Sequence, residues 1–141
     1  MMTTETLYKE VLLDHFHHPR NKGDLAGADV TRRGSNPRCG DEIEVGLDLD
    51  GERIARARFR GRGCSVCIAS ASLMTETVGG LETGAARVLA DAVRDWLGSG
   101  DSGHAPPPAG LESLAAVRAY PARRRCVLLS WEALSDAIDD L

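Results

Sequence analysis

Apolar side chains alternate with polar ones on both sides of a central Asp50-Gly51, and this is the strongest pattern in the chain. Such alternation is typical of β-strands with one buried face, and Asp-Gly is a favoured two-residue hairpin turn. The pattern predicts an antiparallel hairpin with an apolar face and a charged face, acids on its first strand and arginines on its second. The predicted apolar positions are Ile43, Val45, Leu47, Leu49, Ala55, Ala57 and Phe59.

Helical spacing of apolar residues predicts helices over 4–17, 65–78, 83–97 and 122–138, and a short helix at 111–118. Pro19 and Gly79-Gly80 end the first two helices, whereas Pro121 suits the first turn of the last. Residues 28–32 are a weak strand candidate, and residues 98–110 are predicted to form a loop. These elements predict a single α+β domain over residues 1–141, with a small three-stranded antiparallel sheet covered by helices on one side.

The first predicted helix has an apolar side, formed by Leu7, Tyr8, Val11, Leu12 and Phe16. We expect this side to pack on its own domain, and docking on a partner is the alternative. Three histidines, at positions 15, 17 and 18, crowd the end of this helix. We interpret them mainly as exposed or capping groups rather than metal ligands. The histidine at position 104 lies in the predicted loop, where nothing rigid would hold it as a ligand.

Composition narrows the range of functions. The chain has 141 residues, 43% of them hydrophobic and 27% charged, which suits one globular domain. A net charge of −4 and an aromatic content of 4% argue against nucleic-acid binding by charge or by base stacking. No apolar run approaches the roughly 18 residues of a membrane span, and no signal peptide is evident. We therefore expect a cytoplasmic protein without a membrane partner, whose four cysteines are reduced rather than paired.

Three cysteines and one aspartate occupy positions that the predicted fold brings together. Cys39 and Asp41 precede the hairpin and Cys64 follows it. Because the strands of a hairpin return to the same end, these three residues should lie close together. Cys64 lies at the start of one predicted helix and Cys126 in the early turns of another, where the positive helix end lowers the pKa of a thiol.

Thiolates together with one carboxylate suit a four-coordinate Zn²⁺ ion, or iron. We predict one Zn²⁺ per chain on Cys39, Asp41, Cys64 and Cys126. A purely structural zinc site is the alternative, and it is less favoured because a domain of this size has its own core. Cys67 forms a Cys-x-x-Cys pair with Cys64, which alone is a weak signal. We interpret it as a buried, inert thiol, with an alternative ligand or a sulfur relay as the other readings.

Three motifs and one helix rich in small residues resemble the IscU/NifU-N superfamily of iron–sulfur cluster assembly proteins, from residue 7 to residue 138. The motifs are Asn36-Pro37-Arg38-Cys39-Gly40-Asp41, Gly63-Cys64-Ser65 and Pro121-Ala122-Arg123-Arg124-Arg125-Cys126, and the helix contains residues 69–76. Their order and spacing, more than any one motif, carry the similarity, which implies an IscU-like α+β fold.

Within that superfamily the chain looks more like the SufU type than like the IscU scaffold. IscU-type proteins have a histidine before the last cysteine, after a Leu-Pro-Pro-Val-Lys motif. Here Arg125 takes the histidine position and Tyr120-Pro121-Ala122-Arg123 replaces the motif. The interval from Cys64 to Cys126 is also longer. Arginine cannot be a ligand because its guanidinium stays protonated, which makes Asp41 the nearest candidate for the fourth position.

The SufU resemblance implies a sulfurtransferase that accepts persulfide sulfur from a SufS-type cysteine desulfurase and carries it towards a downstream Fe–S scaffold. Cys39 is the expected acceptor, because Gly40 lets its turn move and because a desulfurase histidine would take its position on zinc. Arg123 or Arg125 could steady Asp41 or the anionic persulfide. Two alternatives stay open, namely a scaffold that builds a 2Fe–2S cluster on the same ligands and a non-catalytic, zinc-stabilised regulator of a desulfurase.

Overall fold

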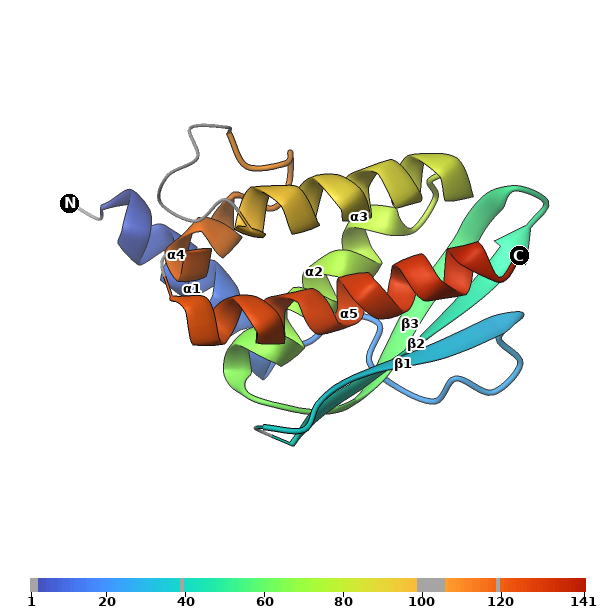
Figure 1. Ribbon diagram of the computed structural model, residues 1–141, viewed down its shortest axis with the longest axis horizontal. Helices are drawn as coiled ribbons and strands as arrows, with labels where there is room; N and C mark the ends of the chain where they lie inside the picture. The colour runs from blue at the N-terminus through green and yellow to red at the C-terminus, as the bar shows by residue number, and fades with distance from the viewer. Residues whose placement is uncertain (1–2, 39, 99–105, 119) are drawn as a thin grey trace.

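The computed structural model describes residues 3–38, 40–98, 106–118 and 120–141, and the predicted elements appear there in the predicted order (Figure 1). The elements are α1 (Thr4–His17), β1 (Val30–Asn36), β2 (Asp41–Asp50), β3 (Arg53–Arg62), α2 (Ser65–Val78), α3 (Thr83–Gly98), the 3₁₀ turn η2 (Glu112–Leu114), α4 (Ala115–Arg118) and α5 (Pro121–Asp139). Strand β1 is longer than predicted and starts later, because its polar sequence carries no alternation and its pairing with β2 decides its extent.

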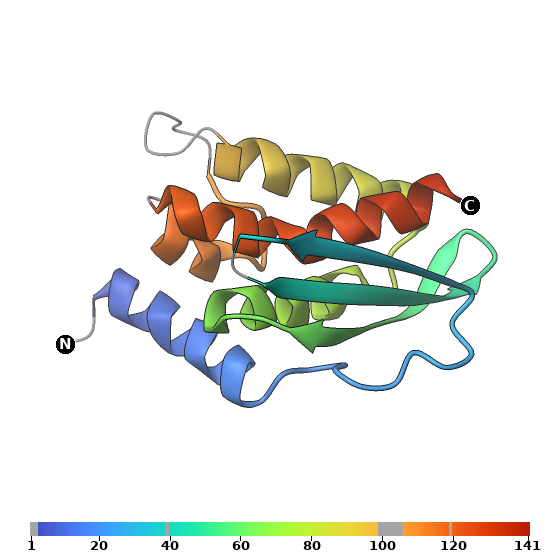
Figure 2. The same cartoon turned by 60° about the horizontal axis from the view of Figure 1, so that its bottom comes forward.

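The sheet has the order β1-β2-β3, and each strand is antiparallel to its neighbour. Helices α2 and α5 lie over one face of the sheet, where α5 contacts β1 and β2 and α2 contacts β3 (Figures 1 and 2). Helix α3 packs on α5, and α1 packs on α2. The predicted α+β fold, with three antiparallel strands covered by helices on one side, is confirmed.

The core lies between the sheet and the helices. Its largest fully buried side chains come from both layers and include Ile43, Leu47, Phe59, Met74, Leu129, Trp131 and Leu134. Strand β1 approaches α5 so closely that a Cβ atom at Gly34 would lie 2.6 Å from the carbonyl oxygen of Leu129. Glycine at position 34 therefore allows the strand to pack directly on the helix backbone.

The tip of the hairpin differs from the prediction by one residue. Strand β2 ends at Asp50 and pairs there with Arg53, so the turn residues are Gly51 and Glu52 rather than Asp50 and Gly51. Gly51 has a φ of +62°, a left-handed conformation that glycine adopts without strain.

A bulge in β3 corrects a second detail of the predicted hairpin. Leu49 pairs with Ile54, whereas Asp48 pairs with Arg56, so that Ala55 is the extra residue of the bulge. Ala55 is consequently exposed and Ile54 is fully buried, although simple alternation assigned Ala55 to the apolar face.

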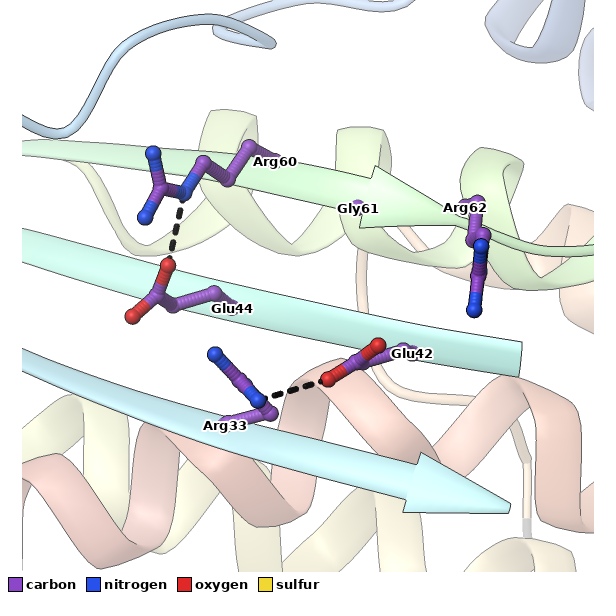
Figure 3. Close-up of a pocket in the computed structure, with 6 residues that line it drawn as sticks. All are labelled: Arg33, Glu42, Glu44, Arg60, Gly61 and Arg62. Atoms are coloured by element: carbon purple, nitrogen blue, oxygen red, sulfur yellow. Dashed lines mark hydrogen bonds and ion pairs between the residues drawn. The ribbon is translucent and has the colours of Figure 1, made fainter. Parts of the chain in front are cut away.

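The other face of the sheet carries the predicted charged residues. Arg33 pairs with Glu42 at 2.8 Å and Arg60 pairs with Glu44 at 2.6 Å, across adjacent strands (Figure 3). The segment before β1 runs along the outer edge of β3. There the Gly23 N–H donates to the carbonyl oxygen of Phe59, and the Phe59 N–H donates to that of Asn21. The two edges of the sheet therefore differ, because backbone of the preceding segment bonds to β3, whereas no described segment bonds to the outer edge of β1.

Helix α1 packs on its own domain, as expected, and its contact with α2 includes a His15–Ser72 hydrogen bond. Leu12 on its apolar side is buried, whereas Leu7 is 46% exposed and Val11 40% exposed. His15 is not the exposed or capping group that the sequence suggested. Its side chain is only 6% exposed, with Nδ1 2.7 Å from Ser72 Oγ and Nε2 3.7 Å from a Glu76 oxygen. That partner lies on a distant helix, which local sequence spacing did not reveal.

Among the described residues, no helix is long and apolar enough to cross a lipid bilayer. Of the predicted loop after α3, the structure describes residues 106–110, which contain neither helix nor strand. His104 lies outside the described residues.

Candidate metal centre

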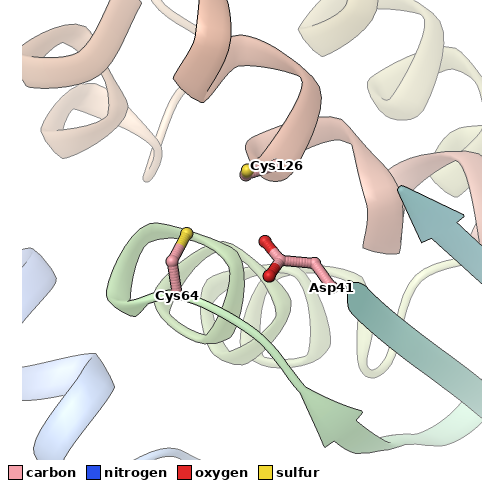
Figure 4. A group of neighbouring side chains, drawn as sticks. All are labelled: Asp41, Cys64 and Cys126. Carbon is pink, nitrogen blue, oxygen red and sulfur yellow. The ribbon is translucent and has the colours of Figure 1, made fainter. Parts of the chain in front are cut away.

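Asp41, Cys64 and Cys126 lie together at one end of the sheet (Figure 4). One carboxylate oxygen and the two sulfur atoms are all within 4.8 Å of one another. Asp41 is the first residue of β2, Cys64 is the N-cap of α2, and Cys126 lies in the second turn of α5. Asp41 and Cys126 are each 5% exposed, whereas Cys64 is half-buried. Three segments far apart in sequence therefore place three donor atoms at a single point, with one side open.

The turn between β1 and β2 positions the carboxylate. Asn36 pairs with Asp41 across the two strands, and its backbone oxygen accepts a 2.9 Å hydrogen bond from the Gly40 N–H. The Asn36 side chain accepts a second bond, 3.2 Å long, from the Arg38 N–H. Gly40 has a φ of +74°, which closes the turn in a conformation that favours glycine. Cys39 lies outside the described residues.

The end of β3 brings Cys64 to the same place. Gly61 has a φ of +139° and lies so close to β2 that a Cβ atom would meet the Glu42 carbonyl oxygen at 2.0 Å. At Gly63 a Cβ atom would meet Cys67 Sγ at 2.8 Å and the Asp41 carboxyl carbon at 3.1 Å. Glycine at position 63 therefore lets Asp41 approach the start of α2.

Asp41 has an unpaired buried oxygen. Its Oδ2 atom is inaccessible to solvent and has no hydrogen-bond partner among the described residues. A buried carboxylate oxygen without a partner is costly. A cation bound by the Asp41 carboxylate and the two sulfur atoms would offset that cost, and an S₂O donor set fits zinc, whose ligands in proteins are thiolate, imidazole and carboxylate.

Burial raises the pKa of the Cys126 thiol, and the Asp41 carboxylate and Cys64 beside it raise this pKa further. The sequence predicted the opposite direction from the helix start alone. Burial and the neighbouring acidic groups outweigh the helix end here, because Cys126 is one turn inside α5 rather than at its first residue. The thiol hydrogen points towards the carbonyl oxygen of Ala122, with 3.8 Å between sulfur and oxygen. Metal binding would therefore have to displace this proton.

The structure brings together three of the four predicted ligands, and their role as ligands stays a prediction. Cys67 is 1% exposed and does not belong to the group of donor atoms. His17 and His18 are exposed, as predicted. Within the described parts of the chain, no second group of three histidine, cysteine, aspartate or glutamate side chains converges in this way.

Arginines surround the opening of the site. A pocket of about 530 Å³ reaches Cys126 and is lined by Asn36, Arg38, Pro121, Ala122, Arg123, Arg125 and Cys126. The sequence pointed to Arg123 and Arg125, but it assigned no role to Arg38 or Asn36. The signal for Arg38 was its place directly before Cys39 in the turn that also holds Asp41.

Comparisons with known proteins agree with this fold. The family model of the NifU-like N-terminal domain matches residues 7–140. The zinc-dependent sulfurtransferase SufU of Bacillus subtilis is 37% identical over 134 residues, which cover 95% of this chain and 90% of that protein. The iron–sulfur cluster assembly scaffold protein IscU of Streptococcus pyogenes is 36% identical over 133 residues, which cover 94% and 82% of the two chains.

Solved structures give the same result. The crystal structure of FiSufU from Fervidobacterium islandicum, a candidate iron–sulfur cluster assembly scaffold of the SUF system, superimposes with a TM-score of 0.84 at 25% identity. The match covers 96% of this chain and 99% of that one. Fold and site together define a small α+β protein with thiol and carboxylate donors at the end of a three-stranded sheet. The chain belongs to the family of NifU-like N-terminal domains, among iron–sulfur cluster assembly proteins of the SufU and IscU types.

Proposed function

We propose that this protein is a zinc-dependent acceptor and carrier of persulfide sulfur, of SufU type, that serves iron–sulfur cluster assembly in the cytoplasm. Its sulfur donor is a SufS-type cysteine desulfurase and its recipient a downstream Fe–S scaffold. The observation that supports this most is the convergence of Asp41, Cys64 and Cys126, of which Cys64 is partly exposed to solvent. Arg125 directly precedes Cys126. The similarity to the zinc-dependent sulfurtransferase of Bacillus subtilis supports the same reading.

Cys39, Asp41, Cys64 and Cys126 would hold the zinc ion, which keeps bound thiols deprotonated. The chain itself supplies the rest of the chemistry. The Cys39 thiolate attacks the terminal sulfur of the desulfurase persulfide, a sulfur–sulfur bond forms on Cys39, and the desulfurase cysteine leaves as a thiolate. Arg123, at the mouth of the site, supports the negative charge of the new persulfide.

The turn that contains Cys39 favours it as the acceptor over the other two cysteines. Cys64 is fixed as the N-cap of α2, and Cys126 is fixed inside α5. Asn36 ends β1 and Asp41 begins β2, so the connection between them can rearrange without unwinding a helix. Both helix-bound cysteines would then keep the donor group assembled while Cys39 reacts.

The test is mass spectrometry of the protein after incubation with a SufS-type desulfurase and cysteine, with peptide mapping of the added sulfur. We expect one added sulfur atom on Cys39, and none in a Cys39→Ser variant that remains folded. Cys67→Ala, which changes a cysteine outside the donor group, is the matched control and should still accept sulfur. Persulfide on Cys67 or Cys126, with Cys39→Ser fully active, would overturn the assignment.

A second candidate function is a scaffold for a 2Fe–2S cluster on the same residues, favoured by the 36% identity to the Streptococcus pyogenes IscU scaffold. The two functions are separated by metal analysis of protein purified without added metal. One zinc per chain supports the sulfur carrier, and iron with visible cluster absorption supports the scaffold. A protein that binds zinc and stimulates the desulfurase without accepting sulfur would instead be its regulator.

A further inference from the structure

The start of helix α5 has the wrong sign of charge for a helix N-terminus. The first turn of a helix carries a partial positive charge, and acidic side chains or a capping group are favoured there. Helix α5 has 19 residues, no acid in its first turn and no side-chain cap from Tyr120. Instead it places arginines at positions 123, 124 and 125, in a chain whose net charge is −4. Such a local conflict is expected where function requires it.

Two of these arginines face a concave surface. Arg124 is turned away, since its Nε donates to the carbonyl oxygen of Arg118 at 2.6 Å. Arg123 and Arg125 line the 530 Å³ pocket together with Arg38, and a neighbouring pocket of about 420 Å³ is lined by Asn36, Pro37, Arg38 and Arg125. None of the described residues that line these two pockets is acidic. Among the described residues, none of the three guanidinium groups forms an ion pair or a hydrogen bond.

The pocket is larger than a persulfide requires. A terminal sulfur atom is comparable in size to a water molecule, which occupies about 30 Å³ in the liquid. The pocket volume of about 530 Å³ lies instead within the range of small-molecule sites, roughly 300–1,000 Å³. Because Cys126 forms part of its lining, a molecule bound there lies next to the group of donor atoms.

We propose that Arg38, Arg123 and Arg125 form an anion subsite for the carboxylate of a low-molecular-weight thiol, and that this thiol takes over the sulfur that the protein carries, as the step between the protein and the downstream scaffold. The inference rests on the proposed function. The bound thiolate attacks the terminal sulfur of the Cys39 persulfide. A new sulfur–sulfur bond forms on the small molecule, the bond to Cys39 breaks, and Cys39 leaves with the electron pair as a thiolate. No external oxidant or reductant is consumed.

The first experiment tests the subsite without sulfur chemistry. Zinc-loaded protein is titrated with 3-(methylthio)propanoate, and with the neutral 3-(methylthio)propanamide, while backbone amide shifts are followed by NMR. We expect saturable shifts at residues 123–126 with the carboxylate only, and binding about threefold weaker in Arg125→Gln and about tenfold weaker in Arg38→Gln/Arg125→Gln. Arg56→Gln is the matched control, because it removes an exposed arginine at the far end of β3. Equal shifts with both compounds, or unchanged binding in the double variant, would overturn the subsite.

The second experiment tests the removal of sulfur. Persulfide-loaded protein is mixed with 3-mercaptopropionate or with neutral 2-mercaptoethanol, and loss of the added sulfur is timed by mass spectrometry. We expect the rate ratio of anionic to neutral thiol to fall about tenfold in Arg38→Gln/Arg125→Gln and to stay constant in Arg56→Gln. If this rate ratio is unchanged in the double variant, the small thiol is not the acceptor of the sulfur. The same result is expected if the arginines bind an acidic partner protein instead. Failure to load any persulfide would contradict the proposed function, while the first experiment would still decide the subsite.

Discussion

Helix α2 contacts buried polar groups at two places, and hydrogen bonds between described residues satisfy these groups at only one of them. In the middle of the helix, Ser72 Oγ lies 2.7 Å from His15 Nδ1 and accepts the Arg20 N–H at 2.9 Å. Thr75 Oγ1 accepts the Asn21 side-chain amide at 3.1 Å. We call these residues the Ser72 cluster. At the start of the helix, the metal-end group of Asp41, Cys64 and Cys126 leaves a buried Asp41 oxygen without a partner in the part of the chain that the structure describes.

This difference distinguishes buried polar groups that stabilise the fold from buried polar groups that serve a function. The Ser72 cluster docks α1 and the following segment on α2 with protein partners alone. The metal-end group would be completed by an ion or a proton. Removing the ion should therefore affect one place and not the other, and the predictions below test that separation.

The largest effect is expected from removing the metal. Because the proposed zinc ion would bind only the folded state, chelation should lower the free energy of unfolding by about 4 kcal/mol relative to protein with free zinc at about 1,000 times its Kd. Denaturant unfolding with and without zinc measures this. Cys126→Ser should lose most of the zinc dependence. If chelated and zinc-loaded protein unfold at the same denaturant concentration, the metal-end group is not an ion site.

Gly63→Ala should disturb the metal-end group directly. The added Cβ atom has no room between Cys67 Sγ and the Asp41 carboxyl group, and overpacking of this kind costs about 1–3 kcal/mol. Zinc affinity, measured by competition with a chromophoric chelator, should fall together with stability. Gly84→Ala is the matched control, because a Cβ atom there meets nothing within 4 Å, and it should keep full zinc affinity. Unchanged zinc affinity in Gly63→Ala would show that Asp41 does not need its present position.

Ser72→Ala should destabilise the protein without touching the metal. It removes the partner of both His15 Nδ1 and the Arg20 N–H, and leaving buried groups unsatisfied costs about 1–3 kcal/mol. The loss should be equal in chelated and zinc-loaded protein, as measured by parallel unfolding curves. A loss that appears in only one of the two forms would mean that the two places are coupled through α2.

The smallest effect is the pH dependence of the Ser72 cluster. Burial lowers the pKa of His15 below 6.5, and the Arg20 charge acts in the same direction, while Glu76 and Asp14 oppose it. The unfolded chain therefore binds this proton more readily than the folded one. The contribution is fully present above pH 6.5 and is lost as the pH falls through the lowered folded-state value, by at most about 1.4 kcal/mol per pH unit. In chelated protein, His15→Gln should have a flatter stability profile below pH 6.5 than the parent. If the stability of the two proteins depends equally on pH below 6.5, His15 is not the source of this pH dependence.

The hairpin and the helices were predictable because their patterns are local. Alternation from Ile43 to Leu49 placed β2, and the return of β3 to the same end correctly placed Cys64 near Asp41. The bulge at Ala55 was missed because alternation assumes an unbroken register. Strand β1 was underestimated because its sequence is polar and its pairing with β2 sets its length.

The site was only partly predictable for a different reason. The expected low pKa of a thiol near a helix start ignored burial, which dominates at Cys126. His15 was misjudged because its partner Ser72 is 57 residues away in sequence. The arginine pocket likewise depends on Arg38 and Arg125 lining the same pocket, which their spacing along the chain does not predict.

The two edges of the sheet affect the tendency of this protein to aggregate at high concentration. An open strand edge offers unpaired backbone groups to a second molecule and is a starting point for aggregation. At β3 the backbone of Asn21 and Gly23 already occupies the groups of Phe59. At β1 the edge remains open, but it carries Arg32 and Arg33, paired with Asp140 and Glu42. One edge is thus blocked by backbone and the other by charge, so a sheet of only three strands presents no ready template for adding a fourth from another copy.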